Sequence, residues 1–300
     1  MLKIAYCPIY SHPLPEGHRF PMVKYELIPE QLIYEGSCTS ENFFCPKLLS
    51  EKWILGVHEE RYWLSLKNET TPPKMIRRIG FPLSAKLVER ERIIAQGTID
   101  CCHFAKLTGV AMNVAGGTHH AFPDKGEGFC LLNDVGIAAN YLLENTIAKR
   151  ILVIDLDVHQ GNGTAVMFQN EPRVFTFSMH GKANYPLHKE KSDLDIPLKT
   201  GTSDEIYLDS LSRYLPKLIE NHQSDFIFFV AGVDILNTDK LGHLAVSREG
   251  CRQRDEYVFS ECKRRSIPLV VSMGGGYSPR LTDIVEAHCN TFRMAQKIYF

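Results

Sequence analysis

Two carboxylates and an imidazole occupy alternate positions after a short apolar run. Residues 151–154 are four aliphatic residues, a pattern typical of a strand buried on both faces of a parallel sheet. Asp155, Asp157 and His159 follow, and in an extended chain their side chains point to one side. Buried charges of this kind are costly unless they pair with one another or bind a cation. Carboxylate oxygen and imidazole nitrogen are ligands for zinc or iron(II), whereas the simpler interpretation is that the acids accept hydrogen bonds from nearby backbone amides.

Similar polar groups follow four other apolar runs of the chain. They are His119 and His120, Ser178 and His180, Asp234, and the glycine turn 274–276 with Tyr277. In open parallel sheets, ligands bind at the carboxyl ends of the strands, which all meet at one edge. Polar chemistry at five strand ends favours a metal-centred active site over simple capping.

The expected ligands leave room for catalysis. Asp157, His159 and Asp234 supply three protein ligands, and three ligands with an open position are typical of a catalytic zinc site. A metal there polarises a carbonyl and lowers the pKa of water. His119 and His120 are suited to supply the base for that water and the acid for a leaving amine.

Two further residues complete the predicted chemistry. Asp155 is suited to orient one of the imidazoles, and Tyr277 is suited to donate a hydrogen bond to an oxyanion. The glycine turn 274–276 lacks the Lys-Ser/Thr of a phosphate-binding loop, and 161–163 lacks the third glycine of a dinucleotide fingerprint. The set therefore predicts metal-assisted hydrolysis of an amide.

Strands and helices alternate along the whole chain, and we see no internal repeat or linker. Strands are predicted over 3–7, 109–115, from 151, over 173–178, 225–232 and 267–273. Helices are predicted over 25–36 and 58–68, from 84, over 100–107, 134–149, 163–168 and 206–219, and from 247 and 281. The segments 11–21 and 181–203 are predicted as loops, the first at the rim of a site. This alternation predicts an α/β fold: one doubly wound, mainly parallel sheet flanked by helices, in a single domain over 1–300.

Composition narrows the class of protein. The 300 residues are 44% hydrophobic with a net charge of -1, so no overall field favours nucleic acid or an anionic membrane. No apolar run approaches the roughly 18 residues that span a bilayer, and the N-terminus does not resemble a signal peptide. Nine cysteines, an odd number without a CxxC pair, predict reduced thiols and a cytoplasmic location.

Five motifs together resemble the zinc-dependent histone deacetylase family, and the similarity runs in order across nearly the whole chain. They are Gly116-Gly117-Thr118-His119-His120, the segment Gly128-Phe129-Cys130 to Asn133-Asp134, Asp155 to Gly163, Ala231 to Asp234, and Gly274 to Tyr277. Residues 13–22 and the short length look most like class IV and its compact bacterial homologues.

The resemblance implies an arginase–deacetylase fold and removal of acyl groups, acetyl or longer fatty acyl, from Nε-acyl-lysine. It assigns zinc, with iron(II) as the alternative, to the three ligands already named. It makes His120 the general base and acid, His119 its assistant and Tyr277 the residue that polarises the carbonyl. The residues that it assigns to a structural potassium ion are Asp155, Asp157, His159, Ser178 and Met179.

The resemblance also implies a substrate tunnel. Phe129 would line it, the Gly128 carbonyl would accept the substrate amide, and Gly275 would be a further substrate-binding residue. Tyr185 is our candidate for the opposite wall. One departure concerns Asn162, which stands where the class I pattern has an aspartate behind the base histidine. An amide orients the ring without a stabilising charge, so we predict a lower pKa for His120 than a carboxylate partner would give.

Three different functions stay open at this level. The first is an arginase-like enzyme with two metals, which needs bridging carboxylates that Val158, Gln160 and Ile235 do not supply. The second is a non-catalytic acyl-lysine binding protein, and the third is a deacetylase of small amines such as acetylpolyamines. The expected partner is therefore an acylated lysine in protein or peptide, or a small acylated amine. The sequence predicts neither nucleic acid binding nor an oligomeric state.

Overall fold

One fully parallel sheet forms the centre of the protein, as the sequence predicts, but it has eight strands where six were predicted. The computed structural model describes residues 1–300, and the strands lie in the order β2-β1-β3-β8-β7-β4-β5-β6. Their bounds are β1 (Lys3–Ala5), β2 (Phe43–Phe44), β3 (Val110–Asn113), β4 (Ile151–Asp155), β5 (Val174–Gly181), β6 (Leu194–Leu198), β7 (Phe226–Ala231) and β8 (Leu269–Met273). Every residue of β3, β4, β7 and β8 is buried, which explains their continuous apolar sequences.

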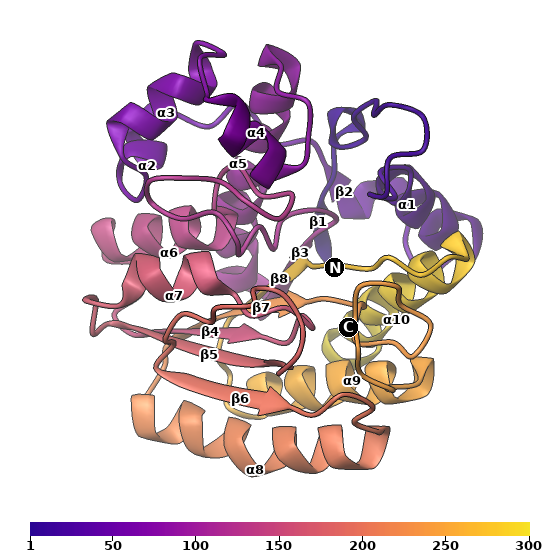
Figure 1. Ribbon diagram of the computed structural model, residues 1–300. Helices are drawn as coiled ribbons and strands as arrows, with labels where there is room; N and C mark the ends of the chain where they lie inside the picture. Colours follow the sequence, from indigo (N-terminus) through magenta and orange to yellow (C-terminus); the bar gives the residue numbers. More distant parts are fainter.

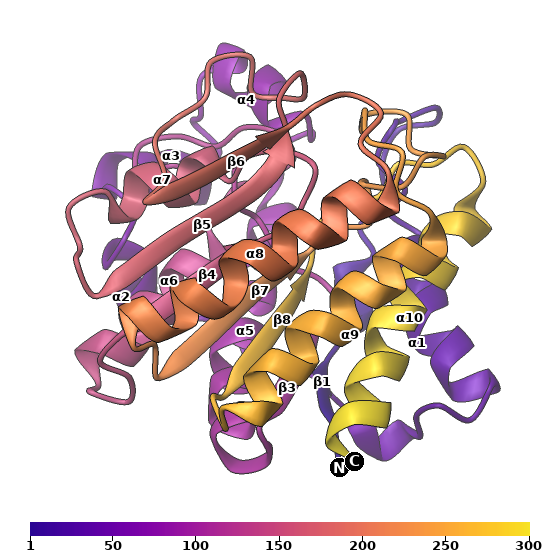
Figure 2. The ribbon, with the colours of Figure 1, turned by 90° about the horizontal axis from the view of Figure 1, so that it is seen from below.

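Helices cover both faces of this sheet. The α-helices are α1 (Lys24–Tyr34), α2 (Glu51–Leu55), α3 (Glu60–Lys67), α4 (Pro73–Ile79), α5 (Ala85–Thr108), α6 (Asp134–Glu144), α7 (Asn162–Phe168), α8 (Asp204–His222), α9 (Arg248–Arg264) and α10 (Leu281–Tyr299), and the short 3-10 helices are η1 (Pro8–Tyr10) and η2 (Ser40–Asn42). In Figure 1, α6 and α7 lie above the sheet while α8 and α9 lie below it, and Figure 2 shows α8, α9 and α10 in front of the strands. The doubly wound architecture is confirmed.

Helix α5 is one long helix where the sequence predicted two. The Ser84 hydroxyl caps it by accepting a hydrogen bond from the Leu87 amide, and Gly109 ends it with a φ of 88°. Gly97 lies inside this helix, where a glycine is normally destabilising. Here it is needed because the residues of η1 pack closely against it. A Cβ there would lie 2.7 Å from the Tyr10 hydroxyl. Close packing against η1 therefore keeps the helix continuous through this residue.

Strand β6 was missed, because its segment was predicted as part of a polar loop. It pairs with β5 at one edge of the sheet and is mostly half-exposed, so its sequence lacks a continuous apolar run. It also contains Pro197, which has no amide hydrogen and is tolerated in edge strands. At the other edge, β2 has only two residues, too few for a sequence pattern.

The five strand ends that carry polar groups belong to five consecutive neighbours, β3-β8-β7-β4-β5. In the register of the sheet, Asp155 lies level with Ser178 on one side and with Val230 on the other. The chemistry-bearing residues that follow these positions therefore emerge side by side at one edge. This arrangement turns five separate sequence signals into one site.

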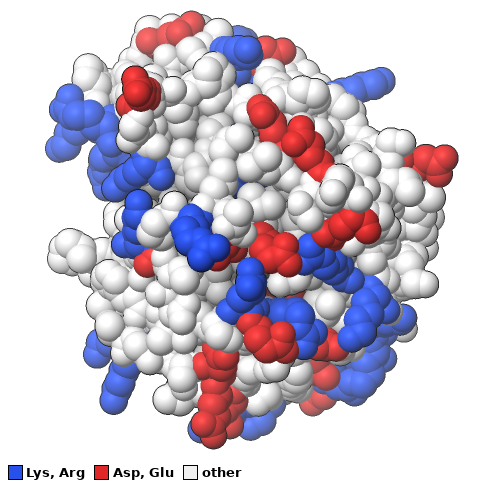
Figure 3. Space-filling model, turned by 90° about the vertical axis from the view of Figure 1, so that its right-hand side faces the viewer, with Lys and Arg blue, Asp and Glu red and all other residues white.

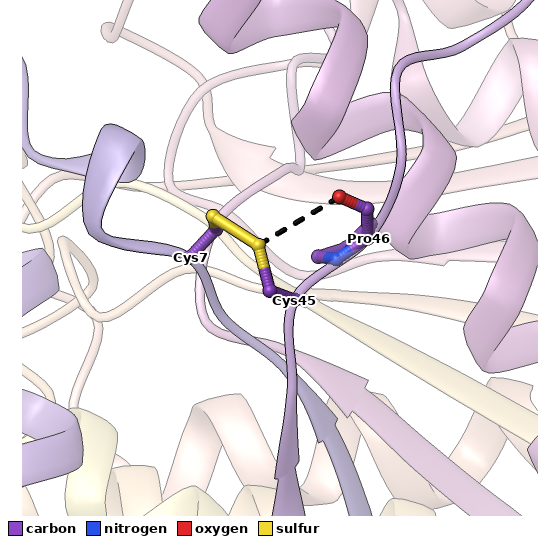
Figure 4. The surroundings of a disulfide bond; sticks show 3 residues. All are labelled: Cys7, Cys45 and Pro46. Atoms are coloured by element: carbon purple, nitrogen blue, oxygen red, sulfur yellow. Dashed lines mark hydrogen bonds between the residues drawn. A yellow bond between two sulfur atoms is a disulfide. The ribbon is translucent and has the colours of Figure 1, made fainter.

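The prediction that all cysteines are reduced is wrong for one pair. Cys7, just after β1, and Cys45, just after β2, form a disulfide, with Cα atoms 4.7 Å apart. Figure 4 shows it beside Pro46, whose carbonyl oxygen lies 3.7 Å from the Cys45 sulfur. The other seven cysteines are free and buried. The pairing of β1 with β2 brings the two cysteines together across 38 residues of sequence, while the cytoplasmic location stays a prediction.

The surface carries mixed charge on the side of α1 and α10. Figure 3 shows basic and acidic side chains interspersed on this face. Arg293 of α10 forms ion pairs with Glu35, which follows α1, and with Glu286. None of the helices is both long enough and apolar enough to cross a bilayer.

A buried ion pair in α9 supports the edge that carries the site. Arg254 is fully buried, and its Nε donates to Asp255 at 2.8 Å. Its Nη1 donates to the carbonyl oxygens of Leu156 and Gly232, which precede two of the predicted metal ligands by one and two residues. The guanidinium thus joins the ends of β4 and β7.

We expect Arg254→Met to lower the free energy of unfolding by about 3–5 kcal/mol, because it leaves the buried Asp255 carboxylate without its partner. Urea unfolding monitored by circular dichroism measures the change. Arg213→Met is the matched control, since Arg213 and its partner Asp209 are both 62% exposed and the expected change is within about 0.5 kcal/mol. Equal shifts in the two variants would contradict the supporting role of Arg254.

Candidate active site

Three predicted ligands converge at the carboxyl edge of the sheet. Asp157, His159 and Asp234 each place one ligand atom within 4.8 Å of the others. His159 Nδ1 lies 2.9 Å from Asp157 Oδ1 and 3.1 Å from Asp234 Oδ2. The remaining carboxylate oxygens accept backbone hydrogen bonds, Asp157 Oδ2 from Gly275 at 2.7 Å and Asp234 Oδ1 from Val158 at 2.9 Å. Backbone amides therefore aim one oxygen of each carboxylate toward His159. Each carboxylate thus accepts a backbone hydrogen bond with one oxygen and keeps the other for a metal.

The extended geometry that the sequence suggested ends at Asp155, the last residue of β4. The chain then turns, so Asp155 does not join the other two residues. Its Oδ2 lies 2.6 Å from His119 Nδ1, and its Oδ1 accepts from the Asp157 amide at 3.2 Å. Asp155 therefore orients an imidazole, which is the geometry predicted for it.

The electrostatics of this group call for a cation. Burial raises the pKa of Asp234 to about 7, and the nearby Asp157 carboxylate adds to the rise. Burial opposes protonation of His159, yet its hydrogen bonds to the two carboxylates outweigh burial and raise its pKa to about 10. The group therefore holds a proton tightly at the point where a divalent cation would neutralise both carboxylates. The donor set, two carboxylate oxygens and one imidazole nitrogen, fits zinc or iron(II).

The glycine turn after β8 closes around these ligands. A Cβ at Gly275 would overlap Asp234 Oδ2, so no larger residue fits. The turn is held from behind by Lys24, which is fully buried and whose Nζ donates to the Gly274 carbonyl at 3.3 Å. Burial lowers the pKa of Lys24 to about 8. At the far end of the turn, Asp239 Oδ2 accepts from the Tyr277 amide at 2.6 Å.

The two adjacent histidines have opposite protonation preferences. Burial disfavours the charged form of both. At His119, the charges of Asp155 and Asp157 outweigh burial and raise the pKa to about 9. At His120, burial and the positive charges of His119 and His159 hold the pKa well below its ordinary range. The hydrogen bond with Asn162 acts in the opposite direction and raises this pKa, and the predicted difference from a carboxylate partner stays a prediction.

The partner of His120 is the predicted one. His120 Nδ1 lies 2.6 Å from Asn162 Oδ1, at the first residue of α7. Behind the amide, Asn162 Nδ2 donates to Glu127 Oε1 at 2.8 Å, and Glu127 Oε2 accepts from Arg78 at 2.7 Å. Sequence analysis did not single out Glu127, which lies in a loop between Gly126 and Gly128.

A cavity of about 210 Å³ opens to the surface in front of the ligands. The residues that line it are Arg19, Arg78, His120, Gly128, Phe129, His159, Tyr185, Leu241 and Tyr277. Phe129 and Tyr185, predicted as opposite walls of a tunnel, both belong to this lining, and the Tyr185 ring lies edge-on to His120 at 5.0 Å between ring centroids. Gly128 is required here, because a Cβ would lie 2.6 Å from the His120 ring and φ is 57°.

Tyr277 also lies on this cavity, half-buried, with its ring 6.4 Å from that of His159. Burial and the charges of Asp234 and Asp157 raise the pKa of its phenol well above the ordinary value, so the hydroxyl keeps its hydrogen. A second cavity of about 40 Å³ lies on the inner side, lined by His119, His120, Asp157 and Tyr277 together with Phe20 and other residues. The loop 11–21 thus supplies residues to both cavities, as its predicted rim position requires.

The β5 residues lie beside the ligands but not among them. Ser178 Oγ lies 2.9 Å from His180 Nδ1, and Met179 is fully buried. Burial lowers the pKa of His180 to about 4, which keeps its ring neutral. Ser178 and Asp155 line a small cavity of about 10 Å³. The assignment of these residues to potassium stays a prediction.

Fold and site together define an α/β protein with a candidate metal-dependent active site at the carboxyl edge of its sheet. The family model described as the histone deacetylase domain matches residues 18–292. The chain therefore belongs to the histone deacetylase family, and its general activity class is that of a deacetylase.

Individual relatives and solved structures are similar to this chain over most of its length. The chain is 43% identical over 296 residues to an uncharacterised protein of Picosynechococcus sp., covering 99% of both chains. It is 29% identical over 269 residues to histone deacetylase 2 of Arabidopsis thaliana, covering 87% of this chain and 70% of that protein. Among solved structures, a histone deacetylase homologue in complex with SAHA has a TM-score of 0.85 at 22% identity, covering 99% of this chain and 84% of that one. The HD domain of HDA15 has a TM-score of 0.81 at 18% identity, covering 99% and 88%.

We expect Asp234→Asn to lose its metal while remaining folded, because the amide keeps the side-chain shape but removes one negative charge from the donor set. After dialysis against zinc, elemental analysis should give about one ion per wild-type chain and less than about a tenth in the variant. Asp225→Asn is the matched control. Asp225 precedes β7 at the amino ends of the strands, on the side of the sheet away from the site, and it accepts hydrogen bonds only from backbone amides. Equal metal content in the two variants would contradict the assignment of Asp234 as a ligand.

Proposed function

We propose that this protein is a metal-dependent hydrolase that removes short acyl groups from the Nε atom of lysine in proteins or peptides. The observation that carries the proposal is the convergence of the Asp157 and Asp234 ligand atoms on His159, which lines the outer cavity together with His120 and Tyr277. Zinc is the expected metal and iron(II) the alternative, and a structural potassium ion near Asp155 and Ser178 is part of the proposal.

The reaction begins with the acyl carbonyl in the outer cavity, next to the three ligands. A bound divalent metal supplies Lewis acidity, which polarises the carbonyl and lowers the pKa of water. The Nε2 atom of neutral His120 then takes a proton from the attacking water, and its low pKa keeps it ready as a base. The protonated phenol of Tyr277 donates a hydrogen bond to the carbonyl oxygen as negative charge develops there.

The second half of the reaction returns the proton. His120 delivers it to the leaving lysine nitrogen, so that the carbon–nitrogen bond breaks with a neutral amine as the leaving group. His119, held by Asp155, stays beside the site, where the charges of Asp155 and Asp157 favour its protonated form. Its charge favours the negative charge that develops on the substrate.

The size of the inner cavity supports a short acyl chain. One water-sized group needs roughly 10–15 Å³ of such space, so about 40 Å³ holds approximately three groups beyond the carbonyl. Acetyl to butyryl chains fit this space, whereas a myristoyl chain requires the surrounding aromatic residues to move. We therefore favour short acyl groups over the long fatty acyl groups that the class IV resemblance suggested.

The charge at the outer cavity supports a peptide over a polyamine. Among the nine lining residues are two arginines and no acid. The exposed Arg19 has no ion-pair partner, and its guanidinium carbon lies 4.9 Å from the centroid of the Phe129 ring. A cationic polyamine meets like charge here, whereas an acidic residue next to the acyl-lysine meets an opposite charge.

A two-metal enzyme and a non-catalytic binding protein both have less support. A second, bridged metal needs a further free carboxylate, but Asp239 accepts hydrogen bonds from the amides of Leu241, Gly242 and Tyr277. A non-catalytic binding protein needs neither a base with a lowered pKa nor a phenol beside the ligands.

We expect the metal-loaded protein to release acyl groups from Nε-acyl-lysine peptides, fastest for acetyl to butyryl, and Tyr277→Phe to lower kcat roughly 100- to 1000-fold, as loss of one oxyanion donor does. A panel from acetyl to myristoyl, with acetylpolyamines alongside, measures both. Tyr214→Phe is the control, since Tyr214 lies on α8 away from the site. Absence of turnover on every substrate, despite bound metal, would refute the proposed hydrolase.

We expect Arg19→Gln to raise KM roughly two- to fivefold for an acetyl-lysine peptide with aspartates on both sides, because it removes one unpaired rim charge. The same peptide with neutral serines should keep its KM, and Arg280→Gln, 78% exposed and outside this cavity, should change neither. A preference for lysine-flanked peptides or acetylpolyamines in the wild type would reverse the assignment of substrate charge.

A further inference from the structure

Behind His120, the Asn162 amide is itself hydrogen-bonded to the carboxylate of Glu127. We propose that Glu127 is a positioning residue for the base: its carboxylate fixes the orientation of the Asn162 amide and, through it, the tautomer of His120. The inference rests on the proposed function, in which His120 accepts a proton at Nε2. Glu127 does not line either cavity. It carries a negative charge that position 162 lacks, because that position is an asparagine.

The contacts of Glu127 form an unbroken chain from the surface to the base. Its side chain is 4% exposed, whereas that of Arg78 is 52% exposed. Arg78 donates to Oε2 at 2.7 Å, Oε1 accepts from Asn162 Nδ2 at 2.8 Å, and Asn162 Oδ1 lies 2.6 Å from His120 Nδ1. Each link lies within hydrogen-bonding distance, and the only charge buried in the chain belongs to Glu127.

The chemistry of the three groups sets the direction of every hydrogen bond. A carboxylate only accepts, so the Asn162 atom that faces Glu127 has to be the NH₂ group. The oxygen of the amide therefore faces His120, and the Gly163 amide also donates to this oxygen at 3.0 Å. An accepting oxygen requires His120 to carry its hydrogen on Nδ1, which leaves the Nε2 lone pair free toward the cavities. The charge of Glu127 thus selects the tautomer that acts as a base.

The negative charge also acts on the transition state. When His120 takes a proton, the imidazolium faces the amide oxygen, and the carboxylate one residue behind polarises that amide in the favourable direction. In a buried site such an aligned pair of hydrogen bonds strengthens itself. Glu127 therefore provides, through the Asn162 amide, the negative charge that an aspartate at position 162 would place directly beside His120.

The side chain of Glu127 is not needed to hold its own loop. Backbone hydrogen bonds run from Cys130 to the Glu127 carbonyl, from Gly128 to Arg78 and from Phe129 to Ile79, all within 3.0 Å. Replacement of the carboxylate by an amide of the same shape leaves these bonds in place. The effect of such a change on the base is therefore separable from the folding of the loop.

The first test is Glu127→Gln. A glutamine presents its oxygen to either Arg78 or Asn162 but not to both, so the Asn162 amide is then held in its orientation by the Gly163 amide alone. We expect kcat on an acetyl-lysine peptide to fall roughly 10- to 100-fold with KM within about twofold, since groups that orient a site residue typically have effects of this size. Glu171→Gln is the matched control, because Glu171 also pairs with an arginine, Arg173, but lies away from the site. A kcat within about twofold of the wild type in Glu127→Gln would overturn the proposal.

The second test exchanges the charge and the amide. In Glu127→Gln/Asn162→Asp, the new aspartate accepts from His120 directly, and the new glutamine donates to it while its oxygen accepts from Arg78. We expect kcat to return to within about threefold of the wild type, because the directions of the hydrogen bonds are restored around a single charge. A purely structural role for Glu127 predicts that the double variant is slower than the single one, and that result would also overturn the proposal.

A third measurement does not depend on turnover. The ¹⁵N chemical shifts of His120 in the zinc-loaded protein, identified by their absence in His120→Gln, report which ring nitrogen carries the hydrogen. We expect the Nδ1–H tautomer in the wild type and in the double variant, and a growing Nε2–H population in Glu127→Gln. Retention of the Nδ1–H tautomer in Glu127→Gln would refute the role of Glu127. If instead the wild type hydrolyses no acyl substrate, the proposed function fails while this measurement still tests the hydrogen-bond chain.

Discussion

The structure depends on the burial of two carboxylates side by side. Asp157 and Asp234 are almost completely inaccessible, and their ligand oxygens meet at one imidazole. Such a pair is stable only where backbone amides, a proton or a metal offset the repulsion. The parallel sheet brings the ends of β4 and β7 together, the turn after β8 supplies an amide, and Arg254 joins the two strand ends from below. Each of these features offsets part of the free-energy cost of burying the two carboxylates side by side.

A second consequence of burial appears in the neighbouring histidines. His119 and His120 are adjacent in sequence and equally inaccessible, yet one pKa is raised and the other lowered. The difference follows from their partners, because Asp155 places a full negative charge next to one ring while Asn162 places only a dipole next to the other. Pairs of titratable groups with opposed pKa values are the usual basis of acid and base roles at one pH.

Much of this molecule could be predicted from local patterns. The buried strands have continuous apolar sequences, and the polar residues that follow β3, β4, β7 and β8 lie together because parallel strands end at one edge. Features that arise only from tertiary contact could not be predicted in the same way. Glu127 and Asn162 are 35 residues apart, Cys7 and Cys45 are 38 apart, and Lys24 reaches Gly274 across 250. Strand β6 was missed for the opposite reason, since a half-exposed edge strand leaves little signal in its own sequence.

The two edges of the sheet have a consequence for the behaviour of the protein at high concentration. An exposed edge strand offers unpaired backbone groups to which a second chain adds a strand, the first step toward aggregation. At one edge β2 ends after two residues, and at the other β6 contains a proline that cannot donate a ladder hydrogen bond. Neither edge is a good template for intermolecular pairing. A fold of eight parallel strands, which forms slowly from distant segments, is thereby protected at the two places where it is most exposed to self-association.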